Sequence, residues 1–155
     1  MMPIPKAEPT INHERSEYRL LYVGRDVDWF RRLKTVLGLS ANRLVYCPGD
    51  SVEYFLKSDI RYDLFLFDLD WLNETGMELA RLTRSLPHRE HTPIIIIAAQ
   101  VTDSLKELAF SAGADECVLK TEDLSAAVET IQRLRQSLDD LSDWFSAEQI
   151  QDDAQ

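Results

Sequence analysis

Two runs of consecutive apolar residues constrain the fold of this chain most strongly. They are Leu64–Phe67 and Ile94–Ile97, the second directly after Pro93. A strand with one face in water alternates apolar and polar side chains, whereas a strand covered on both faces is apolar throughout. Four β-branched residues in a row also disfavour a helix, and proline is tolerated at the start of a strand. The two runs therefore predict strands in the interior of a parallel sheet.

The rest of the chain alternates between strand and helix patterns. Short apolar runs predict three more strands, at Arg19–Val23, Leu44–Cys47 and Cys117–Leu119. Apolar residues at helical spacing predict a helix after each strand, and these helices carry Trp29, Val52, Met77, Leu105 and Leu124. Five such pairs predict right-handed crossovers and one parallel sheet covered by helices on both faces.

Three boundaries inside this pattern are predicted from single residues. A polar loop is expected between Asp68 and Gly76, since the apolar pattern stops there. Asp50 or Ser51 is placed to cap the second helix, and Gly113 is expected as the C-cap of the fourth.

Charge and hydropathy indicate which partners and which cellular compartment to expect. The 155 residues include 17 Lys and Arg and 27 Asp and Glu, a formal net charge of −10, which argues against direct binding to nucleic acid or an anionic membrane. The longest apolar run, Ile94–Ala99, is far shorter than the roughly 20 residues of a spanning helix. Pro3, Pro5 and Pro9 interrupt the segment where an export signal would be apolar. We therefore expect a soluble, cytoplasmic protein.

The two ends of the chain differ from the middle. Residues 1–17 have no apolar period and predict a flexible arm, residues 18–138 form the predicted domain, and residues 139–155 form an acidic tail that could extend the last helix. The apolar seam of that helix continues into the tail through Leu138, Leu141, Trp144 and Phe145. This seam predicts either an interface, for a homodimer or a partner helix, or a segment that folds back on its own domain.

Motifs for metal and nucleotide binding are missing from the sequence. Cys47 and Cys117 are far apart and predict small buried thiols, while His88 and His91 lack a third ligand. No GxGxxG or GK[ST] motif occurs, so nucleotide binding is not expected.

The carboxyl ends of the strands are where chemistry is expected, because open parallel sheets bind ligands in the crevice beyond those ends. Asp68 ends one apolar strand and Lys120 follows another. A carboxylate in such a place needs a cation or hydrogen-bond donors. The pair fits either a nucleophilic carboxylate that accepts a phosphoryl group, with Lys120 on a phosphate oxygen, or a plain buried ion pair.

From Tyr18 to Leu138 the chain resembles the receiver domain of bacterial response regulators. The resemblance rests on four stretches in the family's order: LLYVGRDVD, YDLFLFDLDWLNETG, TPIIIIAAQ and GADECVLK. It implies a flavodoxin-like three-layer α/β fold with strand order 2-1-3-4-5. It also implies that Asp68 is the phosphoacceptor and Lys120 the family's lysine. The resemblance further implies a two-component signalling module that is not an enzyme and binds a histidine kinase or a downstream effector.

Several family residues around that site are replaced here. The two acids that hold Mg²⁺ after the first strand are Gly24 and Arg25 in this chain. The hydroxyl residue at the end of the fourth strand is Ala98, and the aromatic residue of the fifth strand is Cys117. The proline after the lysine is Thr121. We therefore expect no metal and no cofactor in the pocket.

These replacements lead to a hypothesis about Arg25. A guanidinium is permanently charged and can bind a carboxylate through two hydrogen bonds, so Arg25 would reach Asp68 and stand in for the metal, beside Asp26 and Asp70. The protein would then act through protein contacts in one fixed state, independent of phosphorylation. The other interpretation is that Arg25 points to solvent.

Two other functions stay open. A conventional receiver would bind Mg²⁺ and be phosphorylated on Asp68 by a histidine kinase. A haloacid-dehalogenase-like phosphatase would use Asp68 and Asp70 as nucleophile and general acid, because FLFDLD is similar to the strand end of that family. There, however, the motif follows the first strand, whereas here it follows the third.

Overall fold

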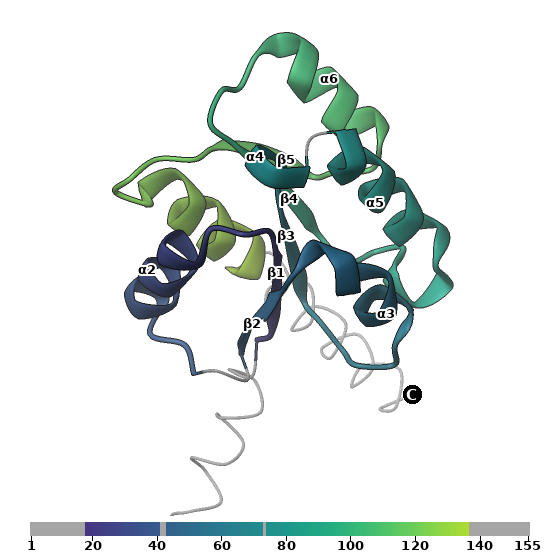
Figure 1. The fold of residues 1–155 in the computed structure, drawn as a ribbon, viewed down its shortest axis with the longest axis horizontal. Helices are drawn as coiled ribbons and strands as arrows, with labels where there is room; N and C mark the ends of the chain where they lie inside the picture. Colours follow the sequence, from purple (N-terminus) through teal and green to yellow (C-terminus); the bar gives the residue numbers. More distant parts are fainter. Residues whose placement is uncertain (1–17, 41–42, 73, 137–155) are drawn as a thin grey trace, which may run out of the picture.

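The computed structural model describes residues 18–40, 43–72 and 74–136. Within them, five parallel strands form one sheet in the order β2-β1-β3-β4-β5 (Figure 1). The strands are β1 (Leu20–Val23), β2 (Leu44–Cys47), β3 (Leu64–Asp68), β4 (Ile94–Ala98) and β5 (Glu116–Leu119). The predicted flavodoxin-like topology and the predicted positions of the strands are confirmed.

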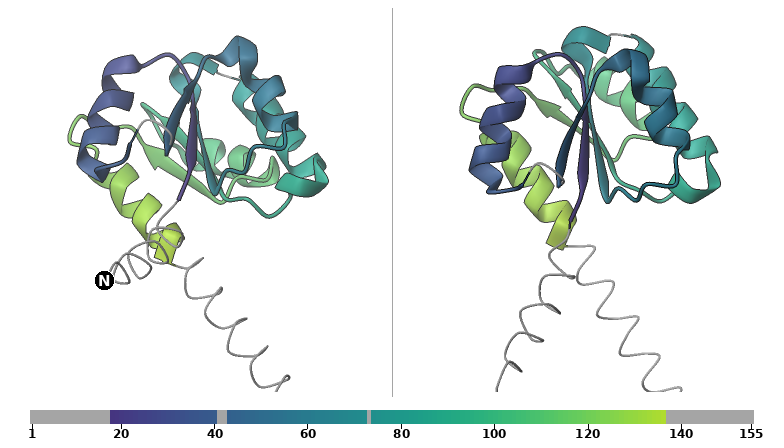
Figure 2. Two further views of the ribbon diagram at one scale, coloured as in Figure 1. Left: turned by 90° about the horizontal axis from the view of Figure 1, so that it is seen from below. Right: turned by 60° about the horizontal axis from the view of Figure 1, so that its bottom comes forward.

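Helices lie on both faces of the sheet, as Figure 2 shows. One face carries α2 (Val27–Leu37) and the helix over residues 125–136. The other carries α3 (Val52–Lys57), α5 (Glu74–Ser85) and α6 (Asp103–Ser111). Each face therefore has its own apolar core, and the three layers are those that the sequence predicts.

The interior strands explain the uninterrupted apolar runs. Every residue of β1, β3 and β4 is buried. Successive side chains of a strand point to opposite faces, so Phe65 and Phe67 enter one core while Leu64 and Leu66 enter the other. Because all five strands run the same way, their carboxyl ends form one edge of the sheet, and Asp68 lies on it.

The segment after β3 differs from the prediction. In place of a polar loop up to Gly76, the chain forms α4 (Leu69–Leu72) and then α5, with Gly76 buried inside α5. A tertiary contact favours this early helix: the Asp70 side chain accepts a hydrogen bond from the backbone N–H of Ala99, 2.9 Å away. The backbone N–H of Asp70 also donates to Asp68 Oδ1 at 3.1 Å, in the manner of a helix cap. The predicted loop was therefore wrong.

Two predicted caps are also adjusted. Ser51 is the N-cap of α3, but its side chain makes no capping hydrogen bond, because the short 3₁₀-helix η2 (Gly49–Ser51) leads directly into α3. The C-cap of α6 is Ala112, and Gly113 follows it with a φ of +108°, a conformation that favours glycine. The glycine signal was thus one residue off.

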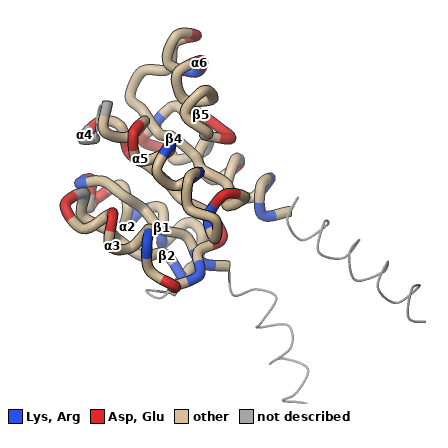
Figure 3. Tube along the Cα trace, turned by 90° about the vertical axis from the view of Figure 1, so that its right-hand side faces the viewer, with Lys and Arg blue, Asp and Glu red and all other residues tan. Residues whose placement is uncertain are grey.

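Several predictions concern residues outside the described ranges. These are the arm over residues 1–17, the tail over residues 139–155 and the interface residues Leu138, Leu141, Trp144 and Phe145. In the described part of the chain, acidic and basic residues are interspersed along the trace (Figure 3). No helix in that part has the length and apolar character needed to cross a membrane.

Candidate functional site

Asp68 is the most deeply buried acid at the carboxyl edge of the sheet, with only 1% of its surface exposed. Both of its oxygens accept hydrogen bonds. Oδ2 accepts from the Tyr22 hydroxyl at 2.6 Å and from Lys120 Nζ at 3.0 Å, and Oδ1 accepts from the backbone N–H of Asp70 at 3.1 Å. These donors supply what a buried carboxylate requires.

Lys120 gathers three carboxylates around one ammonium group. Its Nζ lies 2.6 Å from Asp26 Oδ2, 3.0 Å from Asp68 Oδ2 and 3.3 Å from Asp70 Oδ2, and its side chain is 12% exposed. The same ammonium lies over the Trp29 ring, 5.8 Å from its centroid. Three carboxylates therefore share one ammonium, and Arg32 also acts electrostatically on Asp26.

The ion pairs change the proton affinities of two of these groups. Burial alone would lower the pKa of Lys120, but hydrogen bonds to Asp26 and Asp68 outweigh it and raise that pKa above its ordinary value. For Asp26, burial acts to raise the pKa, but hydrogen bonds from Lys120 and from the Trp29 backbone hold it below the ordinary value. Both groups are charged at neutral pH.

Tyr22 is the site residue that the sequence did not predict. Its hydroxyl donates to Asp68 and accepts a hydrogen bond of 3.1 Å from the backbone N–H of Asp26. Burial, and then the hydrogen bond to Asp68, raise the pKa of this phenol strongly, so it stays protonated. In the sequence, a tyrosine inside the apolar run of β1 looks like any other core residue. The one sequence feature that could have pointed to Tyr22 is the glycine two positions later, where the family has an acid.

Gly24 leaves no room for a side chain where the resembled family has an acid. A Cβ atom placed there would lie 2.6 Å from the Tyr22 hydroxyl and 2.7 Å from Asp68 Cβ, both far below van der Waals contact. Among the described residues, no group of three His, Cys, Asp or Glu has the geometry to hold a metal ion as the side chains now lie, with the Lys120 ammonium among the three carboxylates. The residues of this pocket therefore do not fit the Mg²⁺ that the resemblance would imply.

Comparison with solved structures identifies the architecture. The chemotaxis response regulator CheY4 of Vibrio cholerae matches with a TM-score of 0.64 over 76% of this chain and 98% of its own, at 18% sequence identity. The HemR receiver domain of Leptospira biflexa matches with a TM-score of 0.64 over 76% of this chain and 94% of its own, at 23% identity. This is the fold of a response-regulator receiver domain.

Sequence comparison agrees with the receiver fold. Over 90 residues, 55% of this chain, the identity to the phosphate regulon transcriptional regulatory protein PhoB of Rhizobium meliloti is 34%. The aligned part is at most 38% of the length of the curated relatives that match. No model of a protein family matches the chain.

The receiver fold brings most of the predicted site residues together. Asp26, Asp68, Asp70 and Lys120 meet at the carboxyl edge. Ala98 ends β4 beside them and lines a cavity of about 450 Å³ together with Asp70, Met77 and other residues.

Arg25 takes a different place from the one that the hypothesis gave it. It is exposed, and the contacts of Asp68 among the described residues include no guanidinium. The cation at Asp68 is Lys120, so the predicted contact from Arg25 was wrong. Arg25 comes two residues after the end of β1, next to the buried Gly24, and its side chain is exposed there.

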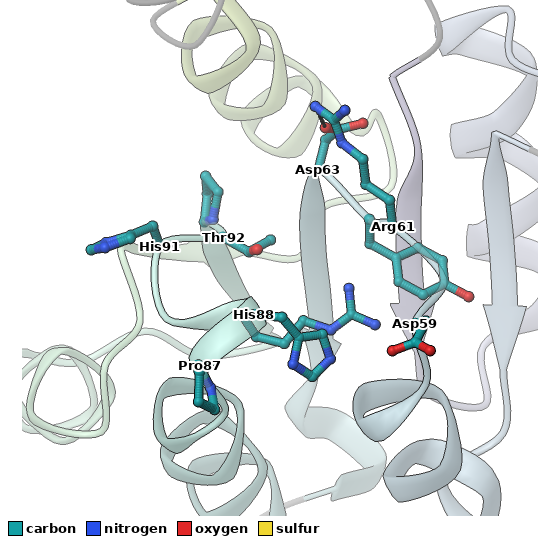
Figure 4. A pocket seen from close by; sticks show the side chains of 10 residues that line it. Asp59, Arg61, Asp63, Pro87, His88, His91 and Thr92 are labelled. Atoms are coloured by element: carbon teal, nitrogen blue, oxygen red, sulfur yellow. Dashed lines mark ion pairs between the residues drawn. The ribbon is translucent and has the colours of Figure 1, made fainter.

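A second cavity, of about 400 Å³, lies at the opposite edge of the sheet (Figure 4). Its lining comes from segments that precede β3 and β4, including Asp63 and Thr92. In Figure 4 the Arg61 side chain runs to Asp63, with which it forms an ion pair of 3.3 Å, and His91 points away from the other labelled side chains. This cavity is separate from the Asp68 pocket.

Proposed function

We propose that the chain is a receiver-like module of a two-component or phosphorelay system that signals through protein contacts without being phosphorylated. The arrangement around Asp68 carries this proposal. Both of its oxygens already accept hydrogen bonds, and Lys120 is shared by three carboxylates. An incoming phosphoryl group would add negative charge beside three carboxylates that already share one ammonium, and phosphoryl transfer depends on cations that neutralise this charge.

Two further replacements support a single fixed state. The position where the family has a hydroxyl residue is Ala98, which is buried at the end of β4. The position where the family has an aromatic residue is Cys117, which packs against one apolar core. Neither side chain can hydrogen-bond a phosphoryl group strongly, so the pocket has no group of the usual kind to report phosphorylation.

The output of such a module would be contact with a protein. Leu108 and Phe110 on α6 are 54% and 50% exposed, and Leu119 at the end of β5 is 44% exposed. We propose exposed apolar positions of α6 and of the end of β5 as contact sites for a kinase or a downstream effector in the cytoplasm, and the C-terminal seam as a site of self-association. Exposed apolar groups on neighbouring elements are typical of such contacts.

Incubation with a small phosphodonor and Mg²⁺ tests the proposal. We expect no stoichiometric gain of a phosphoryl group in the intact mass of the protein, under conditions that phosphorylate a conventional receiver. Stoichiometric phosphorylation that is lost in Asp68→Asn would contradict the proposal and establish the conventional receiver. Hydrolysis of a generic phosphate ester, lost in the same variant, would instead indicate the phosphatase.

A further inference from the structure

We propose that the Lys120 ammonium and the Tyr22 hydroxyl together take the place of a divalent cation in the Asp68 pocket, so that these two side chains exclude Mg²⁺. The inference deepens the proposed function, on which it rests for its meaning in signalling. Its test needs no phosphodonor, so the two proposals can fail separately.

The Lys120 ammonium lies where a metal ion would meet the carboxylates of the pocket. Lys120 Nζ lies within 3.3 Å of one oxygen from each of Asp26, Asp68 and Asp70, and these acids come from the α2 N-terminus, β3 and α4. Oxygen atoms from several carboxylates are the ligands that Mg²⁺ and Ca²⁺ prefer, at roughly 2.0–2.6 Å. A metal ion would have to displace the ammonium to reach the same three oxygens.

Tyr22 is the second step, because it closes the remaining side of Asp68. Its hydroxyl donates a hydrogen bond to Asp68 Oδ2 at 2.6 Å, so that oxygen already accepts from two donors. The ring is fully buried and lies 5.6–5.8 Å, between centroids, from the rings of Trp29, Phe30 and Tyr46. A ring packed on three others cannot swing aside to admit an ion and its water.

The backbone at Gly24 passes too close to the pocket to carry a side chain. An acid at this position would supply a metal ligand, but its Cβ would lie 2.6 Å from the Tyr22 hydroxyl. It would also lie 2.7 Å from Asp68 Cβ, so the backbone in this arrangement has no room for an acid at residue 24 beside Tyr22 and Asp68.

Metal binding to wild type and to two lysine variants tests the inference. Lys120→Met removes the ammonium and leaves three facing carboxylates, whereas Lys57→Met removes an exposed lysine of α3 as a matched control. The probes are Mg²⁺ and Ca²⁺ in thermal unfolding and Tb³⁺ in luminescence. Trp29 sensitises Tb³⁺ bound at the lysine position, because its ring lies 5.8 Å from that point.

We expect wild type and Lys57→Met to show no change of Tm with 10 mM Mg²⁺ and only weak Tb³⁺ luminescence, on the order of background. Lys120→Met should bind Tb³⁺ and Ca²⁺ at least about tenfold more tightly and gain Tm with Ca²⁺, since its carboxylates have lost their cation.

Two outcomes would overturn the inference. One is millimolar Mg²⁺ binding by wild type that is lost in Asp68→Asn. The other is a Lys120→Met protein that is folded by circular dichroism but binds metal no better than wild type. If Lys120→Met does not fold, the Mg²⁺ titration of wild type tests the exclusion of the metal, and Tyr22→Phe replaces Lys120→Met as the variant. A Tyr22→Phe protein that binds Mg²⁺ more tightly than wild type supports the role of the hydroxyl, and unchanged binding removes it.

Discussion

Gly24 lies where the end of β1 comes closest to Asp68, and the Tyr22 ring fills the space beside it. Gly24→Ala should lower the free energy of unfolding by about 1–3 kcal/mol, the usual cost of forcing an extra methyl group into a packed interior. Urea unfolding measures the effect. Gly38→Ala is the control, because nothing lies within 4 Å of its Cβ and its cost comes only from a φ of +67°.

The partner of Gly24 can be identified by a double-mutant cycle. Tyr22→Leu removes the hydroxyl and Cζ atoms that a Cβ at residue 24 would meet at 2.6 and 2.9 Å. The cost of Gly24→Ala should therefore be smaller in the Tyr22→Leu background, by more than about 0.5 kcal/mol. Strictly additive costs would show that Asp68 Cβ, and not Tyr22, sets the limit.

At the scale of elements, the strands and the two charged residues Asp68 and Lys120 were predictable, because both depend on the local sequence pattern. Uninterrupted apolar runs identify interior strands, and Asp68 and Lys120 directly follow such runs. The helix at α4 was not predictable, because it depends on the hydrogen bond between Asp70 and Ala99, which are 29 positions apart. The role of Tyr22 was hidden for the same reason, since its partner Asp68 lies on another strand.

Helix α3 shows how a distant side chain can stabilise a short element. It has six residues, too few to be stable alone. The Arg89 guanidinium, 2% exposed, donates to the backbone carbonyls of Leu56, Phe55 and Ser58 at 3.0, 3.2 and 3.0 Å. A cation at these carbonyls complements the negative end of the helix dipole.

Removal of this cap should destabilise the protein strongly. Arg89→Met keeps most of the apolar stem but removes the guanidinium donors of three carbonyls. The Phe55 carbonyl still accepts from the Ser58 N–H and hydroxyl, and the Ser58 carbonyl still contacts His88 Nε2. We therefore expect a loss of about 2–4 kcal/mol in the free energy of unfolding, most of it from the Leu56 carbonyl and the lost charged hydrogen bonds. Arg61→Met is the matched control, because that side chain is 86% exposed and its ion pair with Asp63 is 3.3 Å long; its cost should stay within about 1 kcal/mol. Equal costs in urea unfolding would show that Arg89 does not cap α3.

At the scale of the whole molecule, the pocket joins segments that are far apart in the chain. Asp26 caps α2, Asp68 ends β3 and Lys120 follows β5, so one ion cluster connects the first and last strands of the sequence through the middle one. Protonation of the cluster should therefore affect global unfolding and not one loop alone.

The direction of the pH effect follows from the two pKa shifts. The pKa of Asp26 is lowered in the folded protein, so its contribution to stability is present above the unfolded value of about 3.9 and is lost as the pH falls through the folded pKa. The pKa of Lys120 is raised, so its contribution is present below about 10.4 and is lost as the pH rises through the folded pKa. Both contributions are complete near neutral pH.

Asp26→Asn separates the charge of this residue from its cap. Asparagine also caps helices well, so the hydrogen bond to the Trp29 N–H is kept while the ion pair with Lys120 is lost. We expect the variant to be less stable than wild type by about 0.5–1 kcal/mol at pH 7, a size typical of a partly exposed ion pair. In urea unfolding between pH 7 and pH 3 this difference should begin to shrink near pH 4, because Asp26 of the unfolded wild-type chain is protonated there before the folded one, whose pKa is lower. Asp28→Asn, an exposed change in the first turn of α2, controls for the helix dipole. A difference that stays constant down to pH 3 would mean that the Asp26 carboxylate contributes packing or capping but no charge, and that the Lys120 ammonium is held by Asp68 and Asp70 alone.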